Sequence, residues 1–189
     1  GADAVLVGSA LMRAPDPAAA FGELFRRPIV KVCGLTREDD VAAAAEAGAD
    51  LAGFVLADSP RRAAEPLAVP DTMLSVAVFV GGAEELGTDL VQLYQEENGH
   101  RARDGVLLRE GETVAQVLDL PWLEEDEAHF ERAAAVEGRV LLAGGLGPDN
   151  VREAIRAVQP WAVDASRSTE SAPGIKDHDK VRAFVEAAR

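Results

Sequence analysis

The only cysteine of the chain stands where a thiol can take part in chemistry. Cys33 ends a β-branched run over residues 29–32, interrupted only by Lys31, and Gly34 and then Thr36 with three acidic residues follow it. The run bounded by glycine predicts a buried strand, and the threonine before acidic residues predicts the start of a helix. Parallel strands of α/β folds place reactive groups at their carboxyl ends. Cys33 is therefore a candidate catalytic residue, and an inert buried thiol is the alternative.

Two turns near the end of the chain are candidate anion sites, because each follows an apolar run that predicts a strand. Glycine lets a backbone approach an anion closely, and turn amides and hydroxyls can donate hydrogen bonds to it. Barrel enzymes often bind phosphate with the loops after their seventh and eighth strands. The predicted phosphate-binding residues are Gly144 and Gly145 in the first turn and Ala165, Ser166 and Arg167 in the second. Glycines that only make tight turns are the alternative.

Composition narrows the class of protein. The chain has 189 residues, 48% of them hydrophobic, and a formal net charge of −14, which predicts one soluble domain that binds neither nucleic acid nor membrane. A small anionic substrate stays compatible, because local amides and cations capture it. One cysteine cannot form an internal disulfide, which favours the cytoplasm. The histidines, His100, His129 and His178, show no metal-ligand spacing and are predicted to lie at the surface, so no metal or cofactor is expected.

Strand-like and helix-like stretches alternate along the chain, which indicates a parallel sheet with helical crossovers. Recurrent glycines after the strands favour a closed barrel over a doubly wound sheet. Helices are expected over residues 38–47, 148–158 and 179–188. Strands are expected near residues 29–32, 51–56, 74–80, 90–94, 115–118, 140–143 and 161–163, with the end of a helix as the alternative for 90–94.

The middle of the chain is less regular. Residues 95–103 are polar and are expected to form a loop, and Glu110-Gly111 lies between two apolar runs, as in a β-hairpin. A barrel of eight strands then lacks one member. We therefore expect an α/β (βα)8 barrel, shortened in the middle, that is either incomplete or completed by an N-terminal strand over residues 4–7.

Seven phrases in order make residues 28–189 resemble the phosphoribosylanthranilate isomerase family, whose fold is a (βα)8 barrel. They are Lys31-Val32-Cys33-Gly34-Leu35-Thr36, the stretch 48–55, Ser59-Pro60-Arg61, the stretch 76–80, the stretch 142–151, Val163-Asp164-Ala165-Ser166 and the stretch 170–177. Residues 1–27 resemble the last strand and helix of indole-3-glycerol-phosphate synthase, to which the isomerase is fused in some bacteria. Two parts are therefore expected, 1–27 and 28–189, the first of them a fragment without activity of its own.

The resemblance implies an Amadori rearrangement of a small phosphorylated substrate in tryptophan biosynthesis. It implies Cys33 as the general base, Asp119 as the general acid, Arg61 as the partner of the anthranilate carboxylate, and Asp164 as a further polar site residue. The family's glycine-rich loop is absent after Asp119, which can instead cap a helix or lie in a loop. Arg167-Ser168 also stands where the family usually has Ser-Gly.

Two other functions remain open at this point. One is a degenerate barrel that binds a phosphorylated ligand or a partner without turnover. The other is a different sugar-phosphate isomerase, such as the related enzyme of histidine biosynthesis, but that family uses two aspartates, so Cys33 argues against it.

Overall fold

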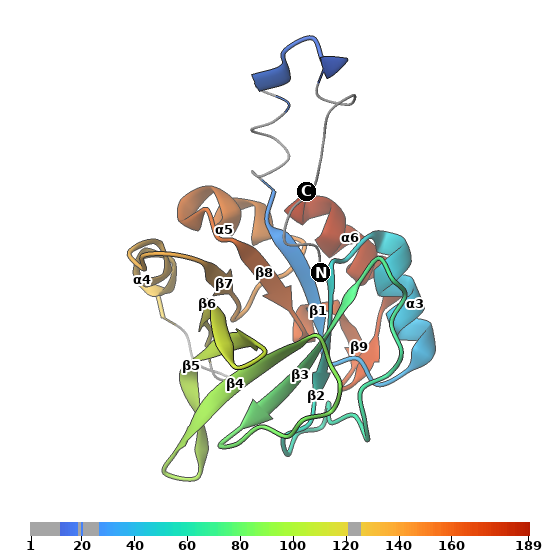
Figure 1. The fold of residues 1–189 in the computed structure, drawn as a ribbon, viewed down its shortest axis with the longest axis vertical. Helices are drawn as coiled ribbons and strands as arrows, with labels where there is room; N and C mark the ends of the chain where they lie inside the picture. The colour runs from blue at the N-terminus through green and yellow to red at the C-terminus, as the bar shows by residue number, and fades with distance from the viewer. Residues whose placement is uncertain (1–11, 19, 21–26, 121–125) are drawn as a thin grey trace.

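The computed structural model describes residues 12–18, 20, 27–120 and 126–189, and eight strands form a closed barrel in it (Figure 1). They succeed one another around the barrel in chain order, and β8 pairs with β1 to close it. The strands are β1 (Ile29–Cys33), β2 (Leu51–Val55), β3 (Leu74–Val80), β4 (Leu90–Glu97), β5 (His100–Arg109), β6 (Glu112–Leu118), β7 (Val140–Leu142) and β8 (Ala162–Ala165). The expected barrel is confirmed.

One strand runs against all the others. β5 is antiparallel to both β4 and β6, whereas every other neighbouring pair is parallel. The predicted hairpin at Glu110-Gly111 is confirmed, with φ of 51° and 82° at these residues, as a tight turn matched to strand twist requires. Residues 90–94 belong to a strand, not to the end of a helix.

The expected loop over residues 95–103 is wrong, and so is the expectation of an incomplete barrel or one completed by residues 4–7. Residues 95–97 continue β4 and 100–103 begin β5, so β5 takes the eighth place. The barrel closes with strands from residues 29–165 alone. Residues 4–7 lie outside the described part of the chain. Backbone pairing with β4 fixes the polar first part of β5, residues 100–103, which has no apolar alternation to reveal it.

Four α-helices of the described residues 27–120 and 126–189 lie along one side of the barrel. They are α3 (Glu38–Ala47), α4 (His129–Ala134), α5 (Val151–Val158) and α6 (His178–Ala188), and Figure 1 shows them around β1, β2, β7 and β8. After β8 come the short helix η1 (Arg167–Thr169) and the paired strands β9 (Glu170–Ala172) and β10 (Ile175–Lys176). Between β2 and β6, a stretch that the structure describes throughout, there is no helix. The barrel is therefore shortened by the loss of helical crossovers.

Side chains of the strands alternate between two apolar layers, as expected for a barrel. Val76, Leu107 and Leu141 fill the interior, whereas residues such as Val30 and Phe54 pack between the barrel and its helices. In the described chain no helix is long and apolar enough to cross a membrane.

Candidate active site

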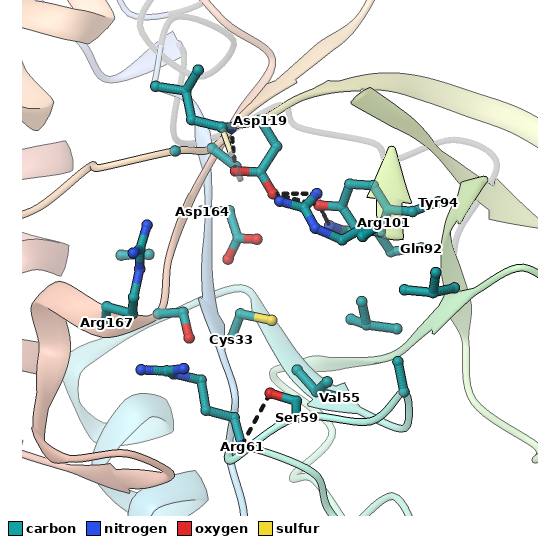
Figure 2. Close-up of a pocket in the computed structure, with 18 of the residues that line it drawn as sticks. Cys33, Val55, Ser59, Arg61, Gln92, Tyr94, Arg101, Asp119, Asp164 and Arg167 are labelled. Atoms are coloured by element: carbon teal, nitrogen blue, oxygen red, sulfur yellow. Dashed lines mark hydrogen bonds and ion pairs between the residues drawn. The ribbon is translucent and has the colours of Figure 1, made fainter. Parts of the chain in front are cut away.

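A cavity of about 750 Å³ opens at the carboxyl ends of the parallel strands (Figure 2). All the site residues predicted from the sequence line it: Cys33, Arg61, Asp119, Gly144, Gly145, Asp164, Ala165, Ser166 and Arg167. They come from parts of the chain more than a hundred residues apart. Closure of the barrel brings them together, because β8 lies beside β1 and the turns after β7 and β8 are neighbours.

Cys33 lies at the floor of this cavity, next to a buried ion pair. Its side chain is 6% exposed, and Lys31 Nζ lies 2.8 Å from Asp164 Oδ2 inside the barrel. Burial raises the pKa of the Cys33 thiol, and the charge of Lys31 opposes this effect. Burial alone would lower the pKa of Lys31, but Asp164 and Cys33 together outweigh it and the net shift is upward. A permanently charged lysine therefore sits close to the candidate base.

Asp164 keeps one oxygen for another partner. Oδ2 binds Lys31, whereas Oδ1 is buried and has no hydrogen-bond partner in the described structure. Burial raises the pKa of Asp164, and Lys31 partly offsets this shift. A buried acceptor without a partner is costly unless a ligand satisfies it. Asp164 Oδ1 is therefore suited to accept a hydrogen bond from a substrate hydroxyl.

Asp119 follows β6 and is held by a network from β4 and β5. The Tyr94 hydroxyl donates to Asp119 Oδ2 over 2.8 Å and accepts a 2.6 Å hydrogen bond from Gln92 Nε2. Arg101 Nη1 lies 3.0 Å from the same carboxylate oxygen, and the Arg101 guanidinium stacks 4.2 Å from the Tyr94 ring. Burial and the charge of Asp119 raise the pKa of Tyr94 well above its usual value. Tyr94 is thus a permanent donor that aims the carboxylate.

The turns after β7 and β8 form one side of the cavity. Gly144 and Gly145 have φ of 86° and 71°, which favour glycine. Ser168 donates to the Leu146 carbonyl, so the second turn is fastened to the first. Ser166 Oγ is buried without a partner among the described residues. This side offers glycine backbone, a hydroxyl and nearby cations, a combination suited to an anion.

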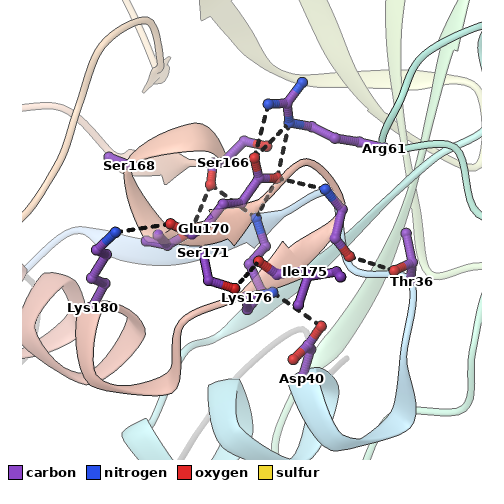
Figure 3. A network of polar contacts seen from close by, with 12 residues as sticks. Thr36, Asp40, Arg61, Ser166, Ser168, Glu170, Ser171, Ile175, Lys176 and Lys180 are labelled. Carbon is purple, nitrogen blue, oxygen red and sulfur yellow. Dashed lines mark hydrogen bonds and ion pairs between the residues drawn. The ribbon is translucent and has the colours of Figure 1, made fainter.

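Arg61 lies on that same side, and a buried glutamate engages it (Figure 3). Its Nε and Nη2 lie 2.8–3.0 Å from the carboxylate of Glu170, and Lys176 Nζ lies 3.2 Å from Glu170 Oε1. A Cβ added to Gly34 would lie 2.9 Å from Ser166 Oγ and 3.2 Å from Arg61 Cδ. Arg61 and Ser166 therefore lie on the same side of the cavity.

Arg167 differs from Arg61 in having no ion-pair partner within the described residues. Its pKa is lowered by burial and by the charge of Arg61. An uncompensated guanidinium beside another one favours an anion between or near them. This side of the cavity therefore carries positive charge, although the net charge of the whole chain is negative.

The sequence did not single out four residues of the site: Lys31, Gln92, Tyr94 and Arg101. Lys31 precedes Cys33 by two residues, and residues two apart in a strand point to the same face. This spacing could have indicated that Lys31 lies beside Cys33. Gln92 and Tyr94 have the same spacing in β4. Arg101 gave no signal, because its stretch was expected to be a loop.

His129 corrects the prediction that all three histidines lie at the surface. It is 2% exposed, and its Nε2 lies 2.8 Å from the Ala143 carbonyl oxygen, just before the first glycine turn. Among the described residues, no group of three or more histidine, cysteine, aspartate or glutamate side chains is arranged to hold a metal ion.

Comparison with known proteins shows which family the chain resembles. Residues 116–187 match the family described as N-(5'phosphoribosyl)anthranilate (PRA) isomerase. The chain is 36% identical to the N-(5'-phosphoribosyl)anthranilate isomerase of Bordetella petrii, over 86% of this chain and 96% of that protein. It is 34% identical to the enzyme of the same name from Haloferax volcanii, over 85% and 92%.

Solved structures agree with the sequence comparison. TrpF from Jonesia denitrificans has a TM-score of 0.65 and 30% identity over 86% of this chain and 97% of that one. A phosphoribosyl anthranilate isomerase in complex with reduced 1-(o-carboxyphenylamino)-1-deoxyribulose 5-phosphate has a TM-score of 0.62 and 28% identity, over 85% and 98%.

The alignment to the Bordetella petrii protein runs over 210 positions, more than the 189 residues of this chain. That relative therefore carries segments that this chain lacks, in keeping with the missing helices between β2 and β6. With its barrel, its cavity and this identity over nearly the whole length of its relatives, the chain belongs to the phosphoribosylanthranilate isomerase family.

Proposed function

We propose that this chain converts N-(5-phosphoribosyl)anthranilate to 1-(2-carboxyphenylamino)-1-deoxyribulose 5-phosphate in tryptophan biosynthesis. The observation that carries the proposal is the pairing of a thiol and a carboxylate, Cys33 and Asp119, on one cavity with an anion-binding side. The names of the relatives support this reaction, and the ligand in the neighbouring complex is a reduced form of the same product.

The reaction needs an acid and a base on the two sides of one sugar. Asp119 donates a proton to the ring oxygen, the C1′–O bond breaks, and a Schiff base forms. Cys33, as thiolate, removes the proton from C2′, and its electron pair gives an enolamine. Tautomerisation of the enolamine yields the ketone. Substrate and product are isomers, so the step needs no oxidant, and we propose that it uses neither cofactor nor metal.

The remaining residues bind the substrate. Gly144, Gly145, Ala165, Ser166 and Arg167 are proposed to hold the phosphate, with backbone amides, a hydroxyl and one cation. Asp164 Oδ1 would accept a hydrogen bond from a ribose hydroxyl. Arg61 Nη1 has no partner among the described residues, and we propose that it meets the anthranilate carboxylate.

We propose that residues 28–189 form the isomerase and that residues 1–27 derive from the end of an indole-3-glycerol-phosphate synthase to which the isomerase is fused or with which it associates. The single cysteine and the biosynthetic role suggest a cytoplasmic protein.

The alternative is a barrel that binds the phosphorylated ligand without turning it over, because it lacks the helices between β2 and β6. Complementation of a tryptophan auxotroph without its isomerase separates the two. We expect growth with the wild-type chain and none with the Cys33→Ala variant, at equal levels of folded protein. Failure of the well-expressed wild-type chain to restore growth would favour the binding protein.

A further inference from the structure

The proposed substrate carries two anions, a phosphate on the ribose and a carboxylate on the aromatic ring. The features suited to phosphate lie on the turns after β7 and β8. The wall across the barrel is different, since it carries the apolar side chains of Val55, Val78 and Val80 together with Tyr94. An aromatic ring suits such a wall. A substrate that spans the cavity therefore brings its carboxylate to the side of β3, β4 and β5.

The cation on this side is Arg101, in the antiparallel strand β5. Its side chain lines the cavity and is 26% exposed. Nη1 contacts Asp119 Oδ2, and the same nitrogen lies 3.4 Å from the Arg103 carbonyl oxygen. Nε and Nη2 have no partner among the described residues. Arg101 therefore keeps the two-nitrogen edge with which arginine binds a carboxylate in bidentate fashion.

Arg61 is the opposite case. Its two-nitrogen edge, Nε and Nη2, is already occupied by Glu170, which leaves Nη1 alone for a ligand. Arg61 also lies beside Ser166, on the phosphate side of the cavity. A carboxylate at the far end of the substrate therefore meets a better-prepared donor in Arg101.

We infer that Arg101 recognises the anthranilate carboxylate, in place of the Arg61 contact proposed above, and so determines specificity for a carboxylated aromatic amine. This inference rests on the proposed function. The Tyr94 ring below the guanidinium and Asp119 at Nη1 hold the side chain in place before the substrate arrives, which reduces the entropy lost on binding. Arg101 lies in β5, the antiparallel strand that takes the place of a parallel strand in this barrel.

Calorimetric titration with two ligands tests the inference. One ligand is reduced 1-(o-carboxyphenylamino)-1-deoxyribulose 5-phosphate, and the other is the same molecule without the ring carboxylate. The proteins are the wild-type chain, Arg101→Gln, Arg101→Lys, Arg61→Gln and, as a matched control on the same strand, Arg109→Gln. Arg109 lines a separate pocket at the other end of β5.

We expect Arg101→Gln to weaken binding of the carboxylated ligand roughly 10- to 100-fold, the range for a charge-assisted contact. Binding of the ligand without carboxylate should change less than about threefold, since it makes no such contact. Arg101→Lys should restore part of the difference, and Arg109→Gln should behave as the wild type.

Two results would overturn the inference. Equal weakening of both ligands would show that Arg101 only supports Asp119, and a carboxylate preference that Arg61→Gln abolishes and Arg101→Gln leaves intact would assign recognition to Arg61 alone. Failure of the wild-type chain to bind either ligand would instead contradict the proposed function, so the two failures are distinguishable.

Discussion

At the scale of single residues, the environment of Cys33 decides how the proposed reaction depends on pH. The thiol lies in the barrel interior, where burial disfavours the thiolate, and Lys31 is the main opposing charge. Nearby cations can lower the pKa of a thiol. At Cys33 the net shift is upward, because removal from water outweighs the lysine.

A raised pKa predicts an alkaline requirement for the proposed base. Cys33 acts only when deprotonated, so in the Asp119→Asn variant, where the acid no longer titrates, kcat/KM should rise with pH through the neutral range and level off above the usual thiol value of about 8.5. The rise should approach tenfold per pH unit if Cys33 alone controls it. Initial rates between pH 6 and 10 measure this, with circular dichroism at each pH to confirm the fold. A plateau already reached at pH 7 would contradict the assignment.

Three arginines surround the cavity of a chain with a net charge of −14, and only some of this could be predicted from the sequence. Arg61 and Arg167 stand in recognisable phrases next to predicted strand ends. Arg101 does not, since its position depends on pairing between strands that hold few apolar side chains. Likewise, nothing in the sequence indicates that Glu170 forms an ion pair with Arg61.

At the scale of elements, a buried carboxylate connects α3 with α6. Asp40 is fully buried and accepts hydrogen bonds from Arg37, from the Lys176 backbone and from His178. Burial alone would raise the pKa of Asp40, but these donors outweigh it and the net shift is downward. The folded state therefore binds this proton more weakly than the unfolded chain does.

This shift predicts how stability depends on acid. A carboxyl with a lowered pKa adds stability above its unfolded value, about 3.9, and that contribution is lost as pH falls through the lower folded value. Asp40→Asn should therefore unfold more easily than the wild type at pH 7. The difference in the free energy of unfolding should shrink as the pH falls below about 4. Urea titrations at pH 7, 5 and 3 test this, and a difference independent of pH would contradict it.

The elements with apolar periodicity could be predicted and the polar ones could not. The strand over residues 74–80 and the helix over 38–47 match β3 and α3 residue for residue. The turn at Glu110-Gly111 was also evident from its residue types. β4 and β5 extend beyond the barrel as a polar ribbon around Asn98-Gly99, and hydrogen bonds between the two strands define it.

At the scale of the whole molecule, closure of the barrel within residues 29–165 has a consequence for the N-terminal part. Strands from residues 29–165 fill all eight positions of the barrel. We expect a chain that begins at residue 28 to fold with a melting temperature within a few degrees of the full chain, because it keeps all eight strands of the barrel. Thermal unfolding followed by circular dichroism compares the two. Loss of cooperative unfolding in the shorter chain would show that residues 1–27 contribute to the core.

The distribution of helices around the barrel matches the distribution of the site residues. Helices remain around β1, β2, β7 and β8, which supply Cys33, Arg61 and the phosphate-binding turns, whereas they are missing where β3–β5 supply mainly a wall. Losing helices there is compatible with keeping the reacting groups in place, since backbone pairing and the buried Leu107 hold β5 between β4 and β6.

Turnover of N-(5-phosphoribosyl)anthranilate by the purified protein tests the central claim most directly. The wild-type chain should consume the substrate and form the ketose, and Cys33→Ala and Asp119→Asn should each lower kcat by about 10²–10⁴-fold with little change in binding of the reduced product. Circular dichroism must show that both variants are folded. Wild-type protein that binds the reduced product without turning over the substrate, or turnover that survives Cys33→Ala undiminished, would contradict the account.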